Sequence, residues 1–142
     1  MALWQFQCYI IPKMNSKIEL VEDELLSWKG KDIPLADFKF LEKTISWTED
    51  IIQYGKEDGT CIQFLYEDGL LEEINCRLDL RSLSKKMLEE ILNYVKKIEG
   101  MIFFENKVYP PDIENTVKLM KNSSANRFCK NPEKYFEELS NC

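Results

Sequence analysis

Alternating apolar and polar positions predict two separate β-strands in the first half of the chain. Residues 3–11 alternate strictly until Pro12 ends the run, and residues 51–55 form a shorter apolar segment bounded by a glycine. One face of the first strand is expected to meet a hydrophobic core. That face is formed by Trp4, Phe6, Cys8 and Ile10.

The clearest strand signal lies in residues 60–81, where two alternating runs flank the dipeptide Asp68-Gly69. Asp-Gly supplies the positive φ that a tight hairpin turn needs, so the segment predicts a β-hairpin with one buried and one wet face. Its loop contains either two residues, 68–69, or three residues, 68–70.

The choice of loop length sets the register of this hairpin. A two-residue loop places Cys61 opposite Cys76 but pairs apolar residues with polar ones. A three-residue loop sets Ile62 opposite Cys76 and Phe64 opposite Ile74, which joins the two apolar faces. We therefore expect the three-residue loop, with Cys61 pointing away from Cys76 and no disulfide in the hairpin.

Apolar residues recur at three- and four-residue steps after Ser84, and they predict a long amphipathic helix that Gly100 stops. Shorter helices are expected at residues 36–45, 112–121 and 131–139, and short strands at 101–104 and 108–109. Residues 13–33 are compatible with either a short helix or an irregular excursion. The apolar face of the long helix is formed by Leu83, Met87, Leu88, Ile91, Leu92, Val95 and Ile98.

This order of elements predicts a single α+β domain over residues 1–142, with an antiparallel sheet and helices packed on one face. A mixed sheet is the alternative, because the long helix between the hairpin and the next strand could serve as a crossover connection. The chain shows no internal repeat, low-complexity segment or linker.

The composition excludes several kinds of active site. The chain has 142 residues, a net charge of −6, no histidine and five scattered glycines. Without histidine there is no Ser-His-Asp triad, Cys-His pair or His-ligated zinc, and the glycines form neither a Walker loop nor a GxGxxG motif. The sequence therefore indicates no catalytic residue, no cofactor and no metal site.

Compartment is predicted from the absence of apolar spans and from the cysteines. No run of 18 apolar residues occurs, and residues 1–10 lack the basic region of a signal peptide, so we expect a cytoplasmic protein. The cysteines are odd in number, far apart and without a CxxC pair, which favours reduced thiols over disulfides or zinc. They are Cys8, Cys61, Cys76, Cys129 and Cys142.

The negative charge is concentrated in the predicted β region. Residues 49–79 carry nine acidic residues against Lys56 and Arg77, a net charge of −7, whereas the rest of the chain is nearly neutral. These acids fall on expected turns and outer strand positions, so we expect them to form one acidic surface. They are Glu49, Asp50, Glu57, Asp58, Glu67, Asp68, Glu72, Glu73 and Asp79, and Trp28 is the expected exposed aromatic beside them.

Four interpretations of the acidic residues are open. Two carboxylates could act as acid and base in glycoside hydrolysis, although exposed turns would not raise the pKa of one of them. Asp-Gly segments resemble calcium loops but lack the spaced oxygen ligands. The charge can also serve solubility and protect a hairpin edge, or it can steer a basic protein partner.

Two further groups carry weaker chemical signals. Arg77, Asp79 and Arg81 share one side of a predicted strand, where they could bind an anion or form an ion-pair ladder. Cys129 is the candidate nucleophile of an enzyme, but no histidine is present to activate it.

Several short segments spread along the chain occur together. They are Leu3-Trp4-Gln5-Phe6, Ile11-Pro12-Lys13, residues 47–55, Glu57-Asp58-Gly59, residues 77–81, Ser124-Ala125, Arg127-Phe128 and Asn131-Pro132. Together they resemble a group of small uncharacterised bacterial proteins that look like the immunity proteins of polymorphic-toxin and contact-dependent inhibition systems. The resemblance runs nearly end to end, and it carries no toxin-binding motif or site residue.

The resemblance implies a non-enzymatic cytoplasmic protein that binds a cognate toxin domain. The acidic residues indicate a basic toxin, for example a nuclease, with no nucleic acid or membrane as partner and a monomer or weak dimer in solution. The alternatives are an interaction module that dimerises through a sheet edge and a carboxylate-dependent hydrolase.

Overall fold

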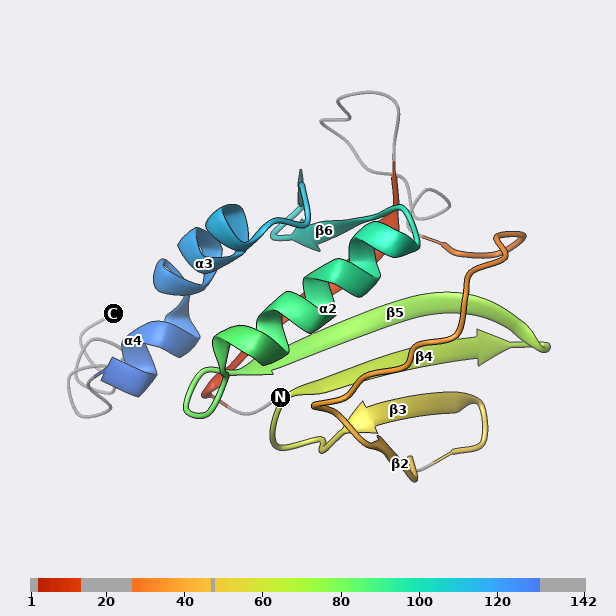
Figure 1. The fold of residues 1–142 in the computed structure, drawn as a ribbon, viewed down its shortest axis with the longest axis horizontal. Helices are drawn as coiled ribbons and strands as arrows, with labels where there is room; N and C mark the ends of the chain where they lie inside the picture. Colours follow the sequence, from red (N-terminus) through yellow and green to blue (C-terminus); the bar gives the residue numbers. More distant parts are fainter. Residues whose placement is uncertain (1–2, 14–26, 47, 131–142) are drawn as a thin grey trace.

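The fold is a seven-stranded antiparallel sheet with strand order β2-β3-β4-β5-β1-β6-β7 (Figure 1). The computed structural model describes residues 3–13, 27–46 and 48–130. The strands are β1 (Gln5–Pro12), β2 (Lys43–Thr44), β3 (Ile51–Gly55), β4 (Cys61–Glu67), β5 (Leu70–Asp79), β6 (Gly100–Phe104) and β7 (Lys107–Tyr109). The helices described are α2 (Lys85–Lys97), α3 (Ile113–Lys121) and α4 (Ser124–Lys130).

The predicted α+β class is wrong, because the sheet dominates the described part of the chain. Seven strands stand against three short helices of 13, 9 and 7 residues in the described ranges. The mixed-sheet alternative is wrong as well, since every strand pairing is antiparallel. The chain enters β6 directly after α2 and runs antiparallel to β1, so α2 joins strands on either side of β1 without making a parallel pair.

The first strand of the chain lies inside the sheet rather than at its edge. β1 pairs with β5 on one side and with β6 on the other. Its apolar side chains Phe6, Cys8 and Ile10 are all buried, as the alternation in the sequence predicts. β1 therefore joins the β2–β5 meander to the β6–β7 hairpin (Figure 1).

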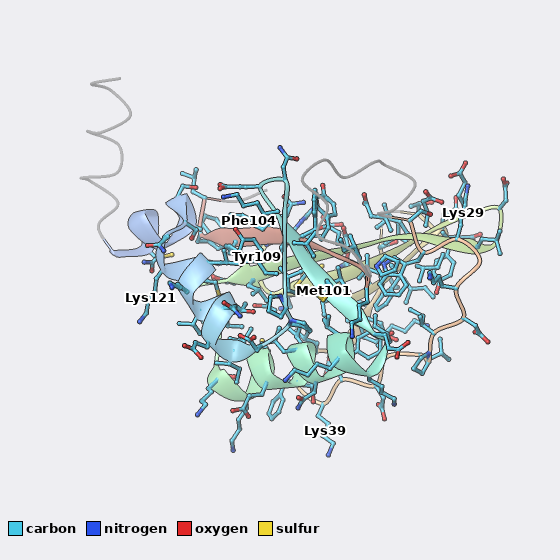
Figure 2. The ribbon with its side chains drawn as sticks, turned by 90° about the horizontal axis from the view of Figure 1, so that it is seen from above. Lys29, Lys39, Met101, Phe104, Tyr109 and Lys121 are labelled. Atoms are coloured by element: carbon cyan, nitrogen blue, oxygen red, sulfur yellow. The ribbon has the colours of Figure 1, made fainter. Side chains whose placement is uncertain are left out.

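One face of the sheet packs against α2 and carries the core. Ser84 caps α2 by accepting a hydrogen bond from the backbone N–H of Met87, and the helix turns its apolar side inward, as predicted. The ring of Tyr94 lies 6.0 Å from that of Phe64 on β4. Seen from above, α2 runs along one side of the sheet, and the labelled Lys29 and Lys121 lie at opposite ends of the molecule (Figure 2).

The hairpin prediction is confirmed in its core pairing and wrong in its turn. Ile62 pairs with Cys76 and Phe64 with Ile74, as expected, and Cys61 faces Arg77 rather than Cys76. The turn, however, is the two-residue loop 68–69, because Glu67 pairs with Leu70. The predicted core pairing and the shorter turn are both possible because the register shifts between residues 65 and 66, where β5 accommodates one extra residue.

The helix predicted at residues 36–45 is wrong. The segment is irregular and ends in β2, and Ile45 is 98% exposed instead of facing the core. Tertiary contacts replace helical hydrogen bonds there. The carboxylate of Glu90 on α2 accepts hydrogen bonds from the backbone N–H groups of Lys39 and Phe40, and the ring of Phe38 packs edge-on against Tyr54 and Tyr94.

The remaining elements follow the prediction closely. The strand at 51–55, the short strands near 101–104 and 108–109, and the helix at 112–121 are confirmed as β3, β6, β7 and α3. The helix α4 was not expected from the sequence. The helix predicted at 131–139 and most of the 13–33 segment lie outside the described residues.

Candidate functional site

The predicted acidic residues fall at two opposite ends of the sheet instead of forming one surface. Six of them surround the start of β3 and the β4–β5 turn, and we call this group the acidic end. The other three lie near the β3–β4 loop, at the far end of β4, about 20 Å away for a seven-residue strand (Figure 1). The acidic end consists of Glu49, Asp50, Glu67, Asp68, Glu72 and Glu73.

Backbone and side-chain contacts hold the acidic end together. The carbonyl oxygen of Asp50 accepts a 2.8 Å hydrogen bond from the backbone N–H of Tyr66, which brings residues 49–50 beside the β4–β5 turn. Lys29 Nζ lies 3.6 Å from Glu67 Oε2 and 3.3 Å from Glu72 Oε2. Contact with Glu72, and then the charge of Glu67, raises the pKa of Lys29. Among the described residues, these two contacts are the ion pairs of the acidic end.

At the opposite end of the sheet, Asp79 is buried in an ion pair with the half-exposed Arg81 and is not part of the acidic surface. Asp79 is only 4% exposed, and its carboxylate accepts hydrogen bonds from the backbone N–H, Nε and Nη2 of Arg81. The guanidinium of Arg81 also lies 3.9 Å from the centroid of the Trp4 ring. Asp79 is therefore a structural residue, and it does not belong to an exposed acidic surface.

A β-bulge shapes the acidic end. Leu65 pairs with Glu73 and Tyr66 pairs with Leu71, so Glu72 is the extra residue on β5. Consecutive residues of a regular strand point to opposite faces, but a bulge re-aims the side chain beside it. Glu72 and Glu73 consequently line the same cavity.

That cavity opens where two neighbouring strands separate. Pairing between β1 and β5 stops at Ile10 and Ile74, after which β1 continues along β6 and β5 continues along β4. The space left between them is a cavity of about 350 Å³. It is lined by Tyr9, Ile10, Ile11, Ser27, Glu72, Glu73 and Phe103.

The cavity combines aromatic rings with carboxylates. Tyr9 pairs directly with Phe103 across β1 and β6, and their ring centroids are 6.5 Å apart. Burial, and then the charge of Glu72, raises the pKa of Glu73. Glu73 forms no ion pair with any described residue, whereas Glu72 is held by Lys29. The site therefore presents, beside two aromatic side chains, one carboxylate that forms no ion pair within the described part of the chain.

The expectation that Trp28 is exposed is wrong. Trp28 is 1% exposed and belongs to the core cluster. Its indole Nε1 donates to the carbonyl oxygen of Ile10, and its backbone N–H donates to the carbonyl oxygen of Glu72. Trp28 thus fills the split between β1 and β5 from the core side instead of serving as a recognition aromatic.

A row of polar side chains crosses the other face of the sheet, and the sequence analysis missed it. Gln53 Nε2 donates to Thr44 Oγ1 at 3.0 Å, and Gln63 Nε2 donates to Gln53 Oε1 at 2.7 Å. Gln63 pairs in turn with Asn75. The signal in the sequence is an amide inside each of the strands β3, β4 and β5, on the side opposite the apolar residues. The buried amides Gln53, Gln63 and Asn75 therefore lie side by side on three neighbouring strands, and the first two are joined by a hydrogen bond.

The expected ion-pair ladder on β5 exists only in part. Arg81 pairs with Asp79, but Arg77 forms no ion pair with a described residue, and its buried Nε has no hydrogen-bond partner. Cys129 has limited chemical activation, because burial and then the charge of Asp79 raise the pKa of its thiol. A raised pKa keeps a thiol protonated near neutral pH and lowers its nucleophilicity.

Comparisons and geometry add few constraints on function. Within residues 3–13, 27–46 and 48–130, no group of three or more His, Cys, Asp or Glu side chains is arranged to hold a metal ion. No helix in these ranges has the length and apolar character needed to cross a bilayer. No protein-family model, curated protein or solved structure matches the chain.

Proposed function

We propose that this protein is a non-enzymatic cytoplasmic immunity protein that neutralises a basic toxin domain by binding it through the acidic end. The observation that carries the proposal is the gathering of six carboxylates at one end of the sheet. Only Glu67 and Glu72 form ion pairs there within the described part of the chain, both with Lys29. Counted over the described residues, the acidic end therefore carries more negative charge than Lys29 compensates.

Uncompensated charge at one end of a small domain favours a partner of opposite sign. It creates a field that orients a cationic protein during encounter and speeds association, by about 10- to 1,000-fold at low salt. Toxin domains that cleave nucleic acids present basic surfaces to their substrates. The motif resemblance to immunity proteins points to the same class of partner.

Dimerisation through a sheet edge gains no support from the edges described here. The edge strands β2 and β7 contain two and three residues. Such short edges offer few free backbone groups to a second copy of the chain. The acidic end remains the stronger candidate for a protein interface.

Two matched double variants test the proposal against the product of the neighbouring gene as the candidate toxin. The test variant is Glu67→Lys with Asp68→Lys, at the end of β4 and in the turn that follows it. The control variant is Glu57→Lys with Asp58→Lys, in the β3–β4 loop. Both change the net charge by the same amount at exposed positions, but at opposite ends of the sheet.

Association rates are measured by stopped-flow at low and physiological ionic strength. At low salt we expect the test variant to associate at least ~10-fold more slowly and the control variant to change less than ~3-fold. The difference should shrink as salt screens the charges. Equal slowing by both variants, or a neighbouring gene product that neither binds nor is toxic, contradicts the proposal.

A further inference from the structure

We propose that the cavity between β1, β5 and β6 is a specific binding site for a guanidinium group, and that its occupant is an arginine side chain of the basic partner. This inference deepens the proposed function and rests on it for the identity of the partner. The site itself is defined by Tyr9, Phe103, Glu72 and Glu73.

The size of the cavity suits one side chain. Its volume is about 350 Å³. Small-ligand pockets range from about 300 to 1,000 Å³, so this one lies at the lower limit. An arginine side chain, with its three-carbon stem and planar head, fits a space of this kind, and Ile11 offers an apolar wall for the stem.

The lining matches a guanidinium in both charge and shape. The faces of aromatic rings attract cations, and the planar guanidinium also stacks on them. Tyr9 and Phe103 bring two rings to the same wall through their cross-strand pairing. Glu73 adds a carboxylate that forms no ion pair with a described residue. A cation there would therefore gain both aromatic and ionic contacts.

The bulge makes this arrangement available before any partner arrives. In a regular strand Glu72 and Glu73 would point to opposite faces of the sheet, but the extra residue turns both toward the cavity. The backbone carbonyl of the bulged Glu72 is fixed by the N–H of Trp28 at 3.1 Å. The backbone that positions the two glutamates is consequently held in place, which reduces the entropy lost on binding.

Arginine is favoured over lysine because the ammonium group of Lys29 already lies beside Glu72. The ammonium group of Lys29 lies 3.6 Å from Glu67 Oε2 and 3.3 Å from Glu72 Oε2, and it does not pair with Glu73. A second compact, strongly hydrated ammonium would enter close to Lys29. A guanidinium spreads its charge and can stack on the rings while it pairs with Glu73.

The test uses the folded protein and small probes, so it does not require the partner. N-acetyl-arginine amide is titrated into the protein while NMR follows the ring signals of Tyr9 and Phe103 and the backbone signals of Glu72 and Glu73. N-acetyl-citrulline amide is the neutral isostere, and N-acetyl-lysine amide is the ammonium probe. The variant is Glu73→Gln, and the control is Glu57→Gln at the other end of the sheet.

We expect saturable shifts of the cavity signals with the arginine probe. The citrulline probe should bind at least ~10-fold more weakly, because it lacks the charge that pairs with Glu73; tenfold in affinity corresponds to about 1.4 kcal/mol. The lysine probe should bind more weakly than arginine. Glu73→Gln should reduce arginine binding to the citrulline level, and Glu57→Gln should leave it unchanged. Melting temperatures of both variants show whether the fold is kept.

The inference fails if arginine and citrulline shift the cavity signals equally, or if arginine shifts acidic residues at both ends of the sheet alike. It also fails if Glu73→Gln is folded and still binds arginine as the natural chain does. The proposed function fails separately: a cavity that binds arginine in a protein that ignores every basic partner supports the site alone. A basic partner held through the acidic end, with no arginine in the cavity, supports the proposed function alone.

Discussion

The indole Nε1 of Trp28 donates a 2.7 Å hydrogen bond to the carbonyl oxygen of Ile10, at the residue where β1 parts from β5. The backbone N–H of the same tryptophan donates to the backbone carbonyl oxygen of Glu72 on β5. Trp28 is therefore hydrogen-bonded to both strands at the point where their pairing ends. It closes the core side of the split whose other side is the cavity.

Replacing Trp28 with phenylalanine should destabilise the protein by about 1–3 kcal/mol, because the buried carbonyl of Ile10 loses its donor and the core loses ring volume. Urea unfolding followed by circular dichroism measures the change. Leu35→Ala is the control, because Leu35 is 81% exposed, and it should change stability by less than about 0.5 kcal/mol. Equal stabilities of the tryptophan variant and the natural chain would contradict the role given to Trp28.

Asp79→Asn should lower stability near neutral pH by about 1–3 kcal/mol, because it removes the charge from a buried carboxylate that is hydrogen-bonded to the half-exposed Arg81. Burial opposes ionisation of Asp79, but the hydrogen bonds and charge of Arg81 outweigh it and lower the pKa of the carboxyl. A carboxyl with a lowered folded-state pKa stabilises the fold above its unfolded pKa and loses this contribution as pH falls through the folded value.

The difference in unfolding free energy between the natural chain and Asp79→Asn should therefore be constant from about pH 5 to 7. It should shrink below about pH 4, near the unfolded pKa of aspartate. Denaturant titrations at several pH values measure it. Glu57→Gln, at an exposed loop position, should show no such difference. A difference that widens on acidification would rule out the stabilising role of the ionised Asp79.

The amide contact between Gln63 and Gln53 should appear as a coupling energy in a double-mutant cycle. Both side chains are buried, and Gln63 Nε2 lies 2.7 Å from Gln53 Oε1. Each change to alanine leaves a buried partner without its hydrogen bond, so each should cost about 1–3 kcal/mol, and the pair less than the sum by about 0.5–1.5 kcal/mol. Strict additivity in urea unfolding would show that the two amides act independently.

The thiols should react with iodoacetamide in the order of their burial. Cys8, Cys61 and Cys76 are buried, whereas Cys129 is partly exposed. Burial also raises the pKa of Cys61 to about 12, so few of its thiols are ionised near pH 8. Among the four cysteines in the described ranges, peptide mass spectrometry at timed intervals should show Cys129 modified first and Cys61 modified only at the rate of unfolding. Early modification of Cys61 in the folded chain would contradict its burial.

Local alternation in the sequence was sufficient to predict most strands and their buried faces. The pairing of Ile62 with Cys76 followed from matching the two apolar faces, and the structure confirms it. The predicted loop is wrong because a regular hairpin with this pairing needs a third residue in its turn. The chain instead places that residue within β5, at Glu72.

The prediction of a helix at residues 36–45 is wrong for a different reason. Three apolar residues at helical spacing fit the pattern, but in the structure Phe38 packs against rings from β3 and α2 while Ile45 points to solvent. The backbone donors of Lys39 and Phe40 are satisfied by Glu90, which is 50 residues away in sequence. Such distant partners are not visible in a local window.

The acidic region was visible in the sequence, but its division into two ends was not. Neighbouring turns of a meander lie at opposite ends of their shared strand, so residues 57–58 and 67–68 separate even though they are close in the chain. Trp28 shows the same limit, since its flanking charges suggested exposure while its ring fills a gap between β1 and β5. The cavity depends on that gap, so no local motif marked it.

The position of β1 in the sheet also sets an order for folding. β1 is made first, but its partners β5 and β6 follow some 60 to 95 residues later in the chain. The β3–β4–β5 meander is closed by short turns, so it can pair early, whereas β1 must close long loops before it gains a neighbour. During synthesis β1 can therefore pair with β5 only after residues 74–79 have emerged, and the sheet becomes continuous only when β1 inserts between β5 and β6.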